Sequence, residues 1–321
     1  MNYKLERYFI ALFMILLGSV GCVRLSEPSN GGLNKTIPSS EESNQSVRLG
    51  TIMPYHSSGF TISSSGDMYF TNFQKAGRIG KLNLGLNEEP EVFIDLADWL
   101  SPVGDRLPKA EGLRIDDEGR LLIAESGTGK LLRISPNARK LEVLADSYDG
   151  YRFATVKDLA IGSKGDLFVS SPLSGTVYRI RPEDGFIGVL NQDLVMVEGL
   201  SLSPDGKRLV AAEPVASRVV VFDLPLELKA VNSWTLVDFS PSGLEPKGLA
   251  FDESGLLYVS LGDREKIRIF DLEQGIEVGI LNAEGISEIL MYFDGYLYVS
   301  GPNGIRRIDP TPKEPLSVKK E

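Results

Sequence analysis

Short apolar stretches alternate with polar turns along residues 47–310, and one arrangement of them recurs six times. In each copy a turn glycine is followed by a strand-like run such as GDMYFTN, GDLFVSS or GLLYVSL, and a second apolar run precedes the glycine. These six glycines are Gly66, Gly119, Gly165, Gly206, Gly255 and Gly295. Their spacings of 53, 46, 41, 49 and 40 residues are typical of a repeat protein that forms one small sheet per copy.

Each copy continues with a third strand, as in GKLLRIS, and the first five copies have a fourth, as in KLEVLAD. The sequence therefore predicts an all-β fold, a six-bladed β-propeller with four antiparallel strands per blade. The sixth copy is followed only by the tail at 311–321, TPKEPLSVKKE. We expect SVRLGTIM at 46–53 to supply its fourth strand and close the ring, because closure removes an unpaired strand edge.

The residue just before the first strand lies eight positions before the turn glycine in every copy. In a propeller these six residues would surround one mouth of the axial tunnel, and we call them the tunnel ring: Ser58, Glu111, Lys157, Glu198, Lys247 and Ser287. The loops of the same face, called here the top face, place five further residues at its rim: His56, Glu125, Glu213, Asp263 and Asn303. Loops on a rigid scaffold commonly carry binding residues, so this face is the predicted functional face.

The composition of the chain limits the partners, the disulfide bonds and the metal sites that are possible. The chain has 34 Lys and Arg against 44 Asp and Glu, a net charge of −10, which argues against nucleic acid as a partner. One cysteine and one histidine exclude an intrachain disulfide and any zinc or copper site built on several such ligands. No cofactor is expected, and an oxygen-ligated ion such as calcium is the one metal that this composition leaves open.

The N-terminus has the features of a targeting segment. Two basic residues precede FIALFMILLGSVG, an apolar run of 13 residues that is short for a membrane span and ends at Cys22. It resembles a bacterial lipoprotein signal, although Ser19 stands where leucine is usual. The resemblance implies a signal peptide at 1–21, an acylated Cys22 and a polar tether at 22–46. An ordinary secretory signal and an uncleaved anchor are the alternatives.

Lipidation would place the protein in a bacterial cell envelope, held to a membrane by its acyl chains. Val23 follows the cysteine, where aspartate favours retention at the inner membrane, so the outer membrane is favoured.

Three copies carry a family resemblance: AEGLRIDDEGRLLIAESGTGKLLRI, VEGLSLSPDGKRLVAAEPVASRVVVFDL and PKGLAFDESGLLYVSLGDREKIRIFDL. They are similar to the gluconolactonase family, which includes senescence marker protein and luciferin-regenerating enzyme, and the similarity covers roughly residues 47–309. It implies a six-bladed propeller that holds one divalent metal, usually calcium, at the tunnel mouth. The implied ligand positions, by blade, are Ser58, Lys157, Glu198 and Lys247.

Of these four, only Glu198 is a strong oxygen ligand, and lysine has no acceptor at all. The alternating charges of Glu111, Lys157, Glu198 and Lys247 predict instead a self-neutralising ion-pair network that fills the tunnel mouth. Two other roles for the lysines are open: binding of an anionic or carbonyl ligand, and service as a nucleophile or base.

Three functions follow. The first is a non-catalytic envelope lipoprotein, a monomer whose top face binds a small molecule or a protein. The second is a lactonase or esterase whose active site has a changed metal site or lacks one. The third is a structural adaptor that assembles through the sides of its blades.

Overall fold

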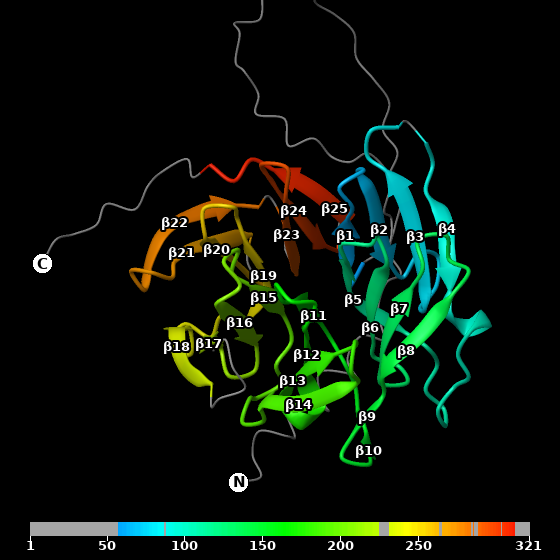
Figure 1. Cartoon of the computed structure of the whole chain (residues 1–321). Helices are drawn as coiled ribbons and strands as arrows, with labels where there is room; N and C mark the ends of the chain where they lie inside the picture. The colour runs from blue at the N-terminus through cyan, green and yellow to red at the C-terminus, as the bar shows by residue number, and fades with distance from the viewer. Residues whose placement is uncertain are drawn as a thin grey trace, which may run out of the picture. The chain divides into compact units, whose positions relative to one another are not determined.

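The computed structural model describes residues 57–311, except residues 87, 225–230, 263–264, 284, 286–287 and 303. All of these belong to one compact unit, Gln45–Glu321. Six antiparallel sheets of this unit surround a common axis, each with its first strand innermost (Figure 1). The prediction of an all-β, six-bladed β-propeller is confirmed.

The first three blades contain four strands each. Blade one contains β1 (Phe60–Ile62), β2 (Asp67–Thr71), β3 (Arg78–Asn83) and β4 (Glu91–Asp95). Blade two contains β5 (Ala110–Ile115), β6 (Leu121–Glu125), β7 (Lys130–Ile134) and β8 (Leu141–Ala145). Blade three contains β11 (Leu159–Ile161), β12 (Leu167–Ser171), β13 (Thr176–Arg181) and β14 (Phe186–Asn191).

The other blades repeat the plan. Blade four contains β15 (Leu200–Leu202), β16 (Arg208–Glu213), β17 (Arg218–Asp223) and β18 (Asn232–Asp238). Blade five contains β19 (Pro246–Phe251), β20 (Leu256–Leu261), β21 (Lys266–Asp271) and β22 (Ile276–Asn282). Blade six contains β23 (Ile289–Phe293), β24 (Tyr296–Gly301) and β25 (Gly304–Ile308).

The connections between blades add little regular structure. A hairpin of β9 (Ser147–Tyr148) and β10 (Tyr151–Arg152) lies between blades two and three. Two 3₁₀ turns, η1 (Leu96–Asp98) and η2 (Pro172–Ser174), are the only helical segments of the described residues. No helix in this part of the chain is long and apolar enough to cross a membrane.

Blade six has three strands within the described residues, and β25 is its outermost. The strand predicted at 46–53 to complete it lies outside the described residues, as do the predicted signal, Cys22, the tether and most of the tail. Closure of the ring by the N-terminus therefore stays a prediction.

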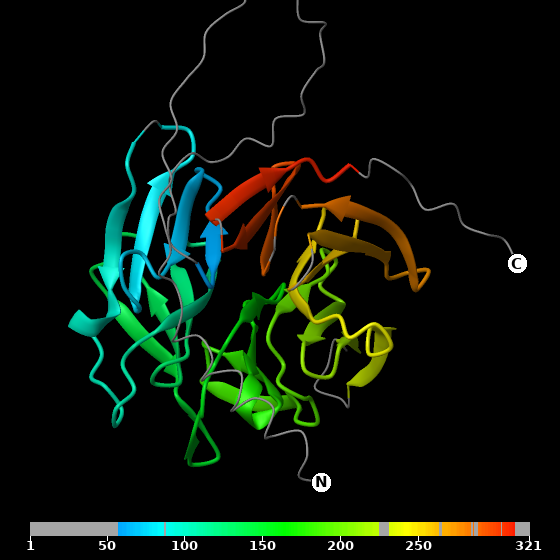
Figure 2. The ribbon, with the colours of Figure 1, turned by 180° about the vertical axis from the view of Figure 1, so that it is seen from behind.

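The core is divided into clusters that lie between neighbouring blades. In the cluster between blades one and two, Tyr69 and Ile79 pack with Leu113 and Ile123, and all four are at most 6% exposed. Because second strands such as β6 and β12 are buried on both faces, they read as continuous apolar runs rather than strict alternation. Figure 2 shows the six sheets from behind.

Glycines bring the inner strands close together around the axis. A Cβ on Gly59 would lie 1.7 Å from the backbone oxygen of Glu111, and one on Gly199 would lie 2.3 Å from that of Lys247. Both glycines directly follow a ring residue. This close contact fixes the top ends of these two inner strands, and it therefore positions the ring side chains that precede the glycines, Ser58 and Glu198.

Candidate functional site at the tunnel mouth

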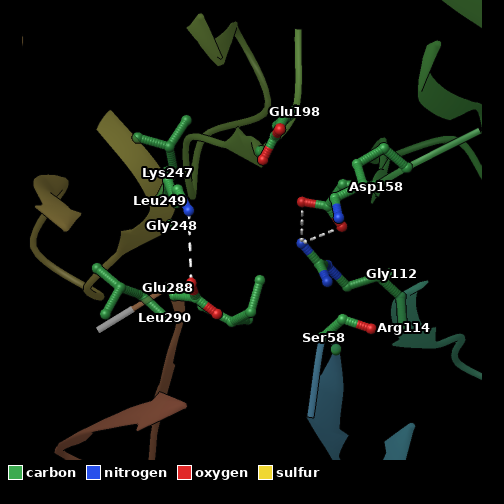
Figure 3. A pocket seen from close by; sticks show the side chains of 14 residues that line it. Ser58, Gly112, Arg114, Asp158, Glu198, Lys247, Gly248, Leu249, Glu288 and Leu290 are labelled. Carbon is green, nitrogen blue, oxygen red and sulfur yellow. Dashed lines mark hydrogen bonds and ion pairs between the residues drawn. The ribbon is translucent and has the colours of Figure 1, made fainter. Parts of the chain in front are cut away.

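Four residues of the predicted tunnel ring line one cavity at the axis: Ser58, Lys157, Glu198 and Lys247. They come from blades one, three, four and five, and Figure 3 labels three of them, with Glu198 and Lys247 facing the same space. The cavity has a volume of about 30 Å³, which holds about two water molecules. Six charged residues line this cavity: Arg114, Lys157, Asp158, Glu198, Lys247 and Glu288.

Glu111, the ring residue of blade two, is buried beside this cavity with 2% of its surface exposed. Its carboxylate accepts a hydrogen bond from Lys157 Nζ at 3.1 Å and forms an ion pair with Lys109 Nζ at 2.6 Å. Burial alone would raise the pKa of Glu111, but the two lysines outweigh it and hold this pKa below its usual value. Burial likewise opposes the charge of Lys157, yet Glu111 and Glu198 raise the pKa of Lys157 above its usual value. Both groups of the pair are therefore charged near neutral pH.

Lys247 has a different partner from the one predicted. Its Nζ lies 3.4 Å from Glu288 Oε1, in blade six (Figure 3). Glu198 makes no side-chain hydrogen bond or ion pair with any other described residue. The predicted crossed network is thus corrected in part: the Glu111–Lys157 pair forms and the charge of Glu198 acts on Lys157, but Lys247 pairs with Glu288 of the next blade instead of with Glu198. Glu288, which lies just after the ring position, offers Lys247 a carboxylate that the sequence argument overlooked.

A second ion pair, which the sequence did not predict, joins two residues that line the cavity. Arg114 Nη2 lies 3.3 Å from Asp158 Oδ1 (Figure 3). Asp158 Oδ2 also accepts a hydrogen bond from the backbone of Leu200 at 2.9 Å. Since these residues belong to blades two, three and four, Asp158 ties three inner strands together.

The sequence did contain a signal for these residues. The position just after the tunnel ring is glycine in four blades and acidic in the other two: Gly59, Gly112, Asp158, Gly199, Gly248 and Glu288. The two acidic exceptions are the carboxylates that pair with Arg114 and Lys247.

Two of the predicted rim residues are fully buried. Glu125 accepts hydrogen bonds from the backbone of Lys109 and Thr128 and from the Thr128 hydroxyl. Glu213 accepts one from the backbone of Val195 at 2.5 Å and one from Arg218 at 2.5 Å. Both are 0% exposed, so they hold top-face loops in place rather than face a ligand.

The remaining predicted residues lie outside the described residues: His56, Asp263, Ser287 and Asn303.

A calcium ion does not fit this set of side chains. Two of the four implied ligand positions carry ammonium groups, which repel a cation and offer it no lone pair. Asp158 and Glu288, the other carboxylates that line the cavity, are engaged by Arg114 and Lys247. No group of three or more His, Cys, Asp or Glu side chains in the described part of the chain has metal-binding geometry.

The Ser58 hydroxyl lies among polar neighbours of blade one. Its hydroxyl accepts a hydrogen bond from Asn72 Nδ2 at 3.0 Å and lies 3.3 Å from Thr71 Oγ1. The carboxylate beside it, Glu111, has a lowered pKa and is therefore a weak base. The described side chains give Ser58 no group that would activate it as a nucleophile.

The fold and the site together define a six-bladed propeller whose tunnel mouth is lined with charged side chains. Residues 107–284, more than half of the chain, match the family described as SMP-30/gluconolactonase/LRE-like region. The chain belongs to this family, as its repeats suggested.

The curated relatives are distant. A gluconolactonase of Zymomonas mobilis is 26% identical over 183 residues, which cover 50% of this chain and 51% of that protein. A strictosidine synthase-like protein of Arabidopsis thaliana is 26% identical over 51% of this chain and 46% of that protein. A lactonase of Staphylococcus aureus is 21% identical over 68% of this chain and 70% of its own length. The chain thus spans about half the length of the first two relatives.

Solved structures share the fold at still lower identity. A gluconolactonase of Xanthomonas campestris superposes with a TM-score of 0.62 and 18% identity, over 78% of this chain and 85% of that one. A luciferin-regenerating enzyme gives a TM-score of 0.62 and 13% identity, over 76% and 83%. At these identities the likeness establishes the fold alone.

Proposed function

We propose that this protein is a lipid-anchored protein of a bacterial cell envelope, and that its gluconolactonase-like propeller binds a ligand or partner at the top face without metal-dependent hydrolysis. The observation that carries the proposal is the pairing of Lys157 with Glu111 and of Lys247 with Glu288, at two positions where the family resemblance implies metal ligands. An ammonium group at each position takes the place of a ligand and supplies positive charge of its own.

The anchor belongs to the proposal because Cys22 ends a short apolar run, as in a bacterial lipoprotein signal. Several acyl chains, each contributing about 0.8 kcal/mol per buried methylene, would hold the protein at a membrane. The outer membrane is the proposed location.

A second candidate function is lactone hydrolysis by an altered active site. It is favoured by the names of two relatives, the gluconolactonase of Zymomonas mobilis and the lactonase of Staphylococcus aureus. Against it stand the two lysine pairs and the weak base beside Ser58.

The test uses purified protein that starts after residue 22. Metal analysis and gluconolactone hydrolysis, each with and without added calcium, are compared with the Zymomonas mobilis gluconolactonase as the positive control. We expect no bound calcium and no hydrolysis above the spontaneous rate. One tightly bound calcium per chain together with calcium-dependent hydrolysis would establish the second function and overturn the first. Hydrolysis without calcium would also overturn the non-catalytic role.

A further inference from the structure

Exposed apolar side chains gather on the top face of blades two to four. Thirteen large apolar side chains are exposed in the described residues, and six of them lie in the top-face connections of these blades: Leu107, Tyr148, Tyr151, Leu173, Val195 and Val215. Trp99 begins the connection that carries Leu107 and adds a seventh. The described parts of the top-face connections of blades one, five and six contribute none. We call this surface the blade 2–4 arc.

The most exposed members are large. Tyr151 is 79% exposed, and Leu107 and Leu173 are each 67% exposed. Apolar side chains scattered singly are ordinary on a protein surface, but their concentration on neighbouring connections of one face favours an interaction site there. Tyrosine, tryptophan and leucine together suit a protein interface in which aromatic anchors are buried on binding.

The connections that carry the arc are held together by hydrogen bonds. Arg106 Nη1, next to Leu107, donates to the backbone oxygen of Ala154 at 2.6 Å. Ser171 Oγ, at the start of the turn that carries Leu173, donates to the backbone oxygen of Thr155 at 2.7 Å. Blades two and three are therefore joined directly at their top-face connections.

The arc continues into blade four in the same way. The backbone nitrogen of Leu194 donates to the Gly175 oxygen at 3.1 Å, which ties the connection of Val195 to the turn of Leu173. Val195 is held by the fully buried Glu213, which also binds Arg218 near Val215. The arc is thus a pre-organised surface, and pre-organisation lowers the entropy that binding must overcome.

Charges beside the arc indicate what kind of partner fits. Four exposed aspartates lie in its connections, and none forms an ion pair within the described residues: Asp98, Asp105, Asp149 and Asp193. The cations of the same connections are fewer, since Arg106 and Arg152 are exposed whereas Lys109 is paired with Glu111. The surface around the arc is therefore acidic, in keeping with the net charge of −10.

We propose that the blade 2–4 arc is the docking surface for a protein partner that presents aliphatic or aromatic side chains flanked by lysine or arginine. The proposal deepens the binding role proposed above and rests on it. A second copy of this chain would bring two acidic surfaces together, and a membrane with anionic lipids would be repelled by the same aspartates. A partner with basic residues around apolar side chains would complement both the aspartates and the apolar side chains of the arc.

Photo-crosslinking of the full chain in the cells that naturally express it tests the proposal. A photoreactive phenylalanine derivative replaces Tyr151 in one variant and Leu173 in another, and replaces Tyr296 and Leu86 as exposed controls outside the arc. Mass spectrometry then identifies the crosslinked molecule and the peptide that carries the bond. We expect both arc positions to give the same protein through a peptide of net positive charge, and the controls to give no such product.

The purified partner then supplies a quantitative measurement. Tyr151→Ser and Leu173→Ser should each weaken its binding to the full chain at least tenfold, whereas Leu86→Ser should leave binding and the thermal midpoint unchanged. No arc adduct above the controls, an adduct with a second copy or with lipid, or an acidic partner peptide would overturn the proposal. Lactone hydrolysis by the same preparation would overturn the proposed function alone, because the crosslinking result does not depend on it.

Discussion

Lys157→Met is the substitution that most sharply tests the ion pair at the tunnel mouth. Methionine keeps the length and much of the apolar stem of lysine but removes the ammonium group. Glu111 would then be left at 2% exposure with only Lys109 as a cationic partner.

The expected magnitude follows from these two partners. Loss of one member of a buried pair usually costs about 3 to 5 kcal/mol, because it strands a buried charge. Lys109 still lies 2.6 Å from Glu111 and is 48% exposed along its side chain, so it compensates in part. We therefore expect Lys157→Met to lower the free energy of unfolding by about 2 kcal/mol at neutral pH.

The effect should depend on pH in a defined direction. The pKa of Glu111 is lowered from 4.5, so its stabilisation is complete above that value and is lost as pH falls through the folded-state pKa. The pKa of Lys157 is raised from 10.5, so its stabilisation is complete below that value and is lost as pH rises through the folded-state pKa. The difference between wild type and variant should be largest between about pH 5 and 10 and smaller at either end.

Urea denaturation at several pH values is the assay. Lys140→Met is the matched control, because Lys140 pairs with Glu142 at the surface and its side chain is 71% exposed. That control should change the free energy of unfolding by less than about 0.5 kcal/mol. Equal, small effects for the two variants at neutral pH would refute the claim that the tunnel-mouth pair is a buried, stabilising pair.

Three further predictions address the scaffold and the N-terminus. Gly59→Ala should lower the free energy of unfolding by about 3 kcal/mol in urea denaturation. The reason is that its Cβ would lie 1.7 Å from a backbone oxygen of blade two. The control Gly85→Ala, whose Cβ would lie 3.4 Å from its nearest atom, should be close to neutral. Removal of residues 1–53 should lower the thermal midpoint relative to removal of residues 1–45, because blade six would lose its predicted fourth strand; equal midpoints would contradict closure by that strand. Cys22→Ser should move the protein from the membrane fraction to the soluble fraction in cell fractionation, and unchanged retention would count against lipidation.

The fold could be predicted from the sequence because each blade repeats one turn glycine between two apolar runs. The same spacing, counted back eight residues, identified Ser58, Lys157, Glu198 and Lys247, which line one cavity. The repeat of the backbone determines which residues reach the axis, so these residues can be predicted from the sequence.

The partners of those residues could not be read in the same way. Whether Lys247 turns to Glu198 or to Glu288 depends on side-chain direction and on the angle between neighbouring blades, which a spacing does not contain. Arg114 reaches the cavity from within an inner strand, beyond the ring position that the repeat identifies. The position of Glu213 at the end of a strand predicts a residue at the rim of the top face. Its side chain is instead buried, where it accepts hydrogen bonds from Val195 and Arg218.

Calcium titration by calorimetry tests the central claim most directly, namely that lysines have replaced the metal at the tunnel mouth. The wild-type protein is compared with a triple variant, Ser58→Glu, Lys157→Asn and Lys247→Asp, which places an oxygen ligand at each of these three positions and retains Glu198. We predict no calcium binding by the wild type at millimolar calcium, and binding of one calcium by the variant if its fold is kept. Stoichiometric binding of one calcium by the wild type would contradict the account.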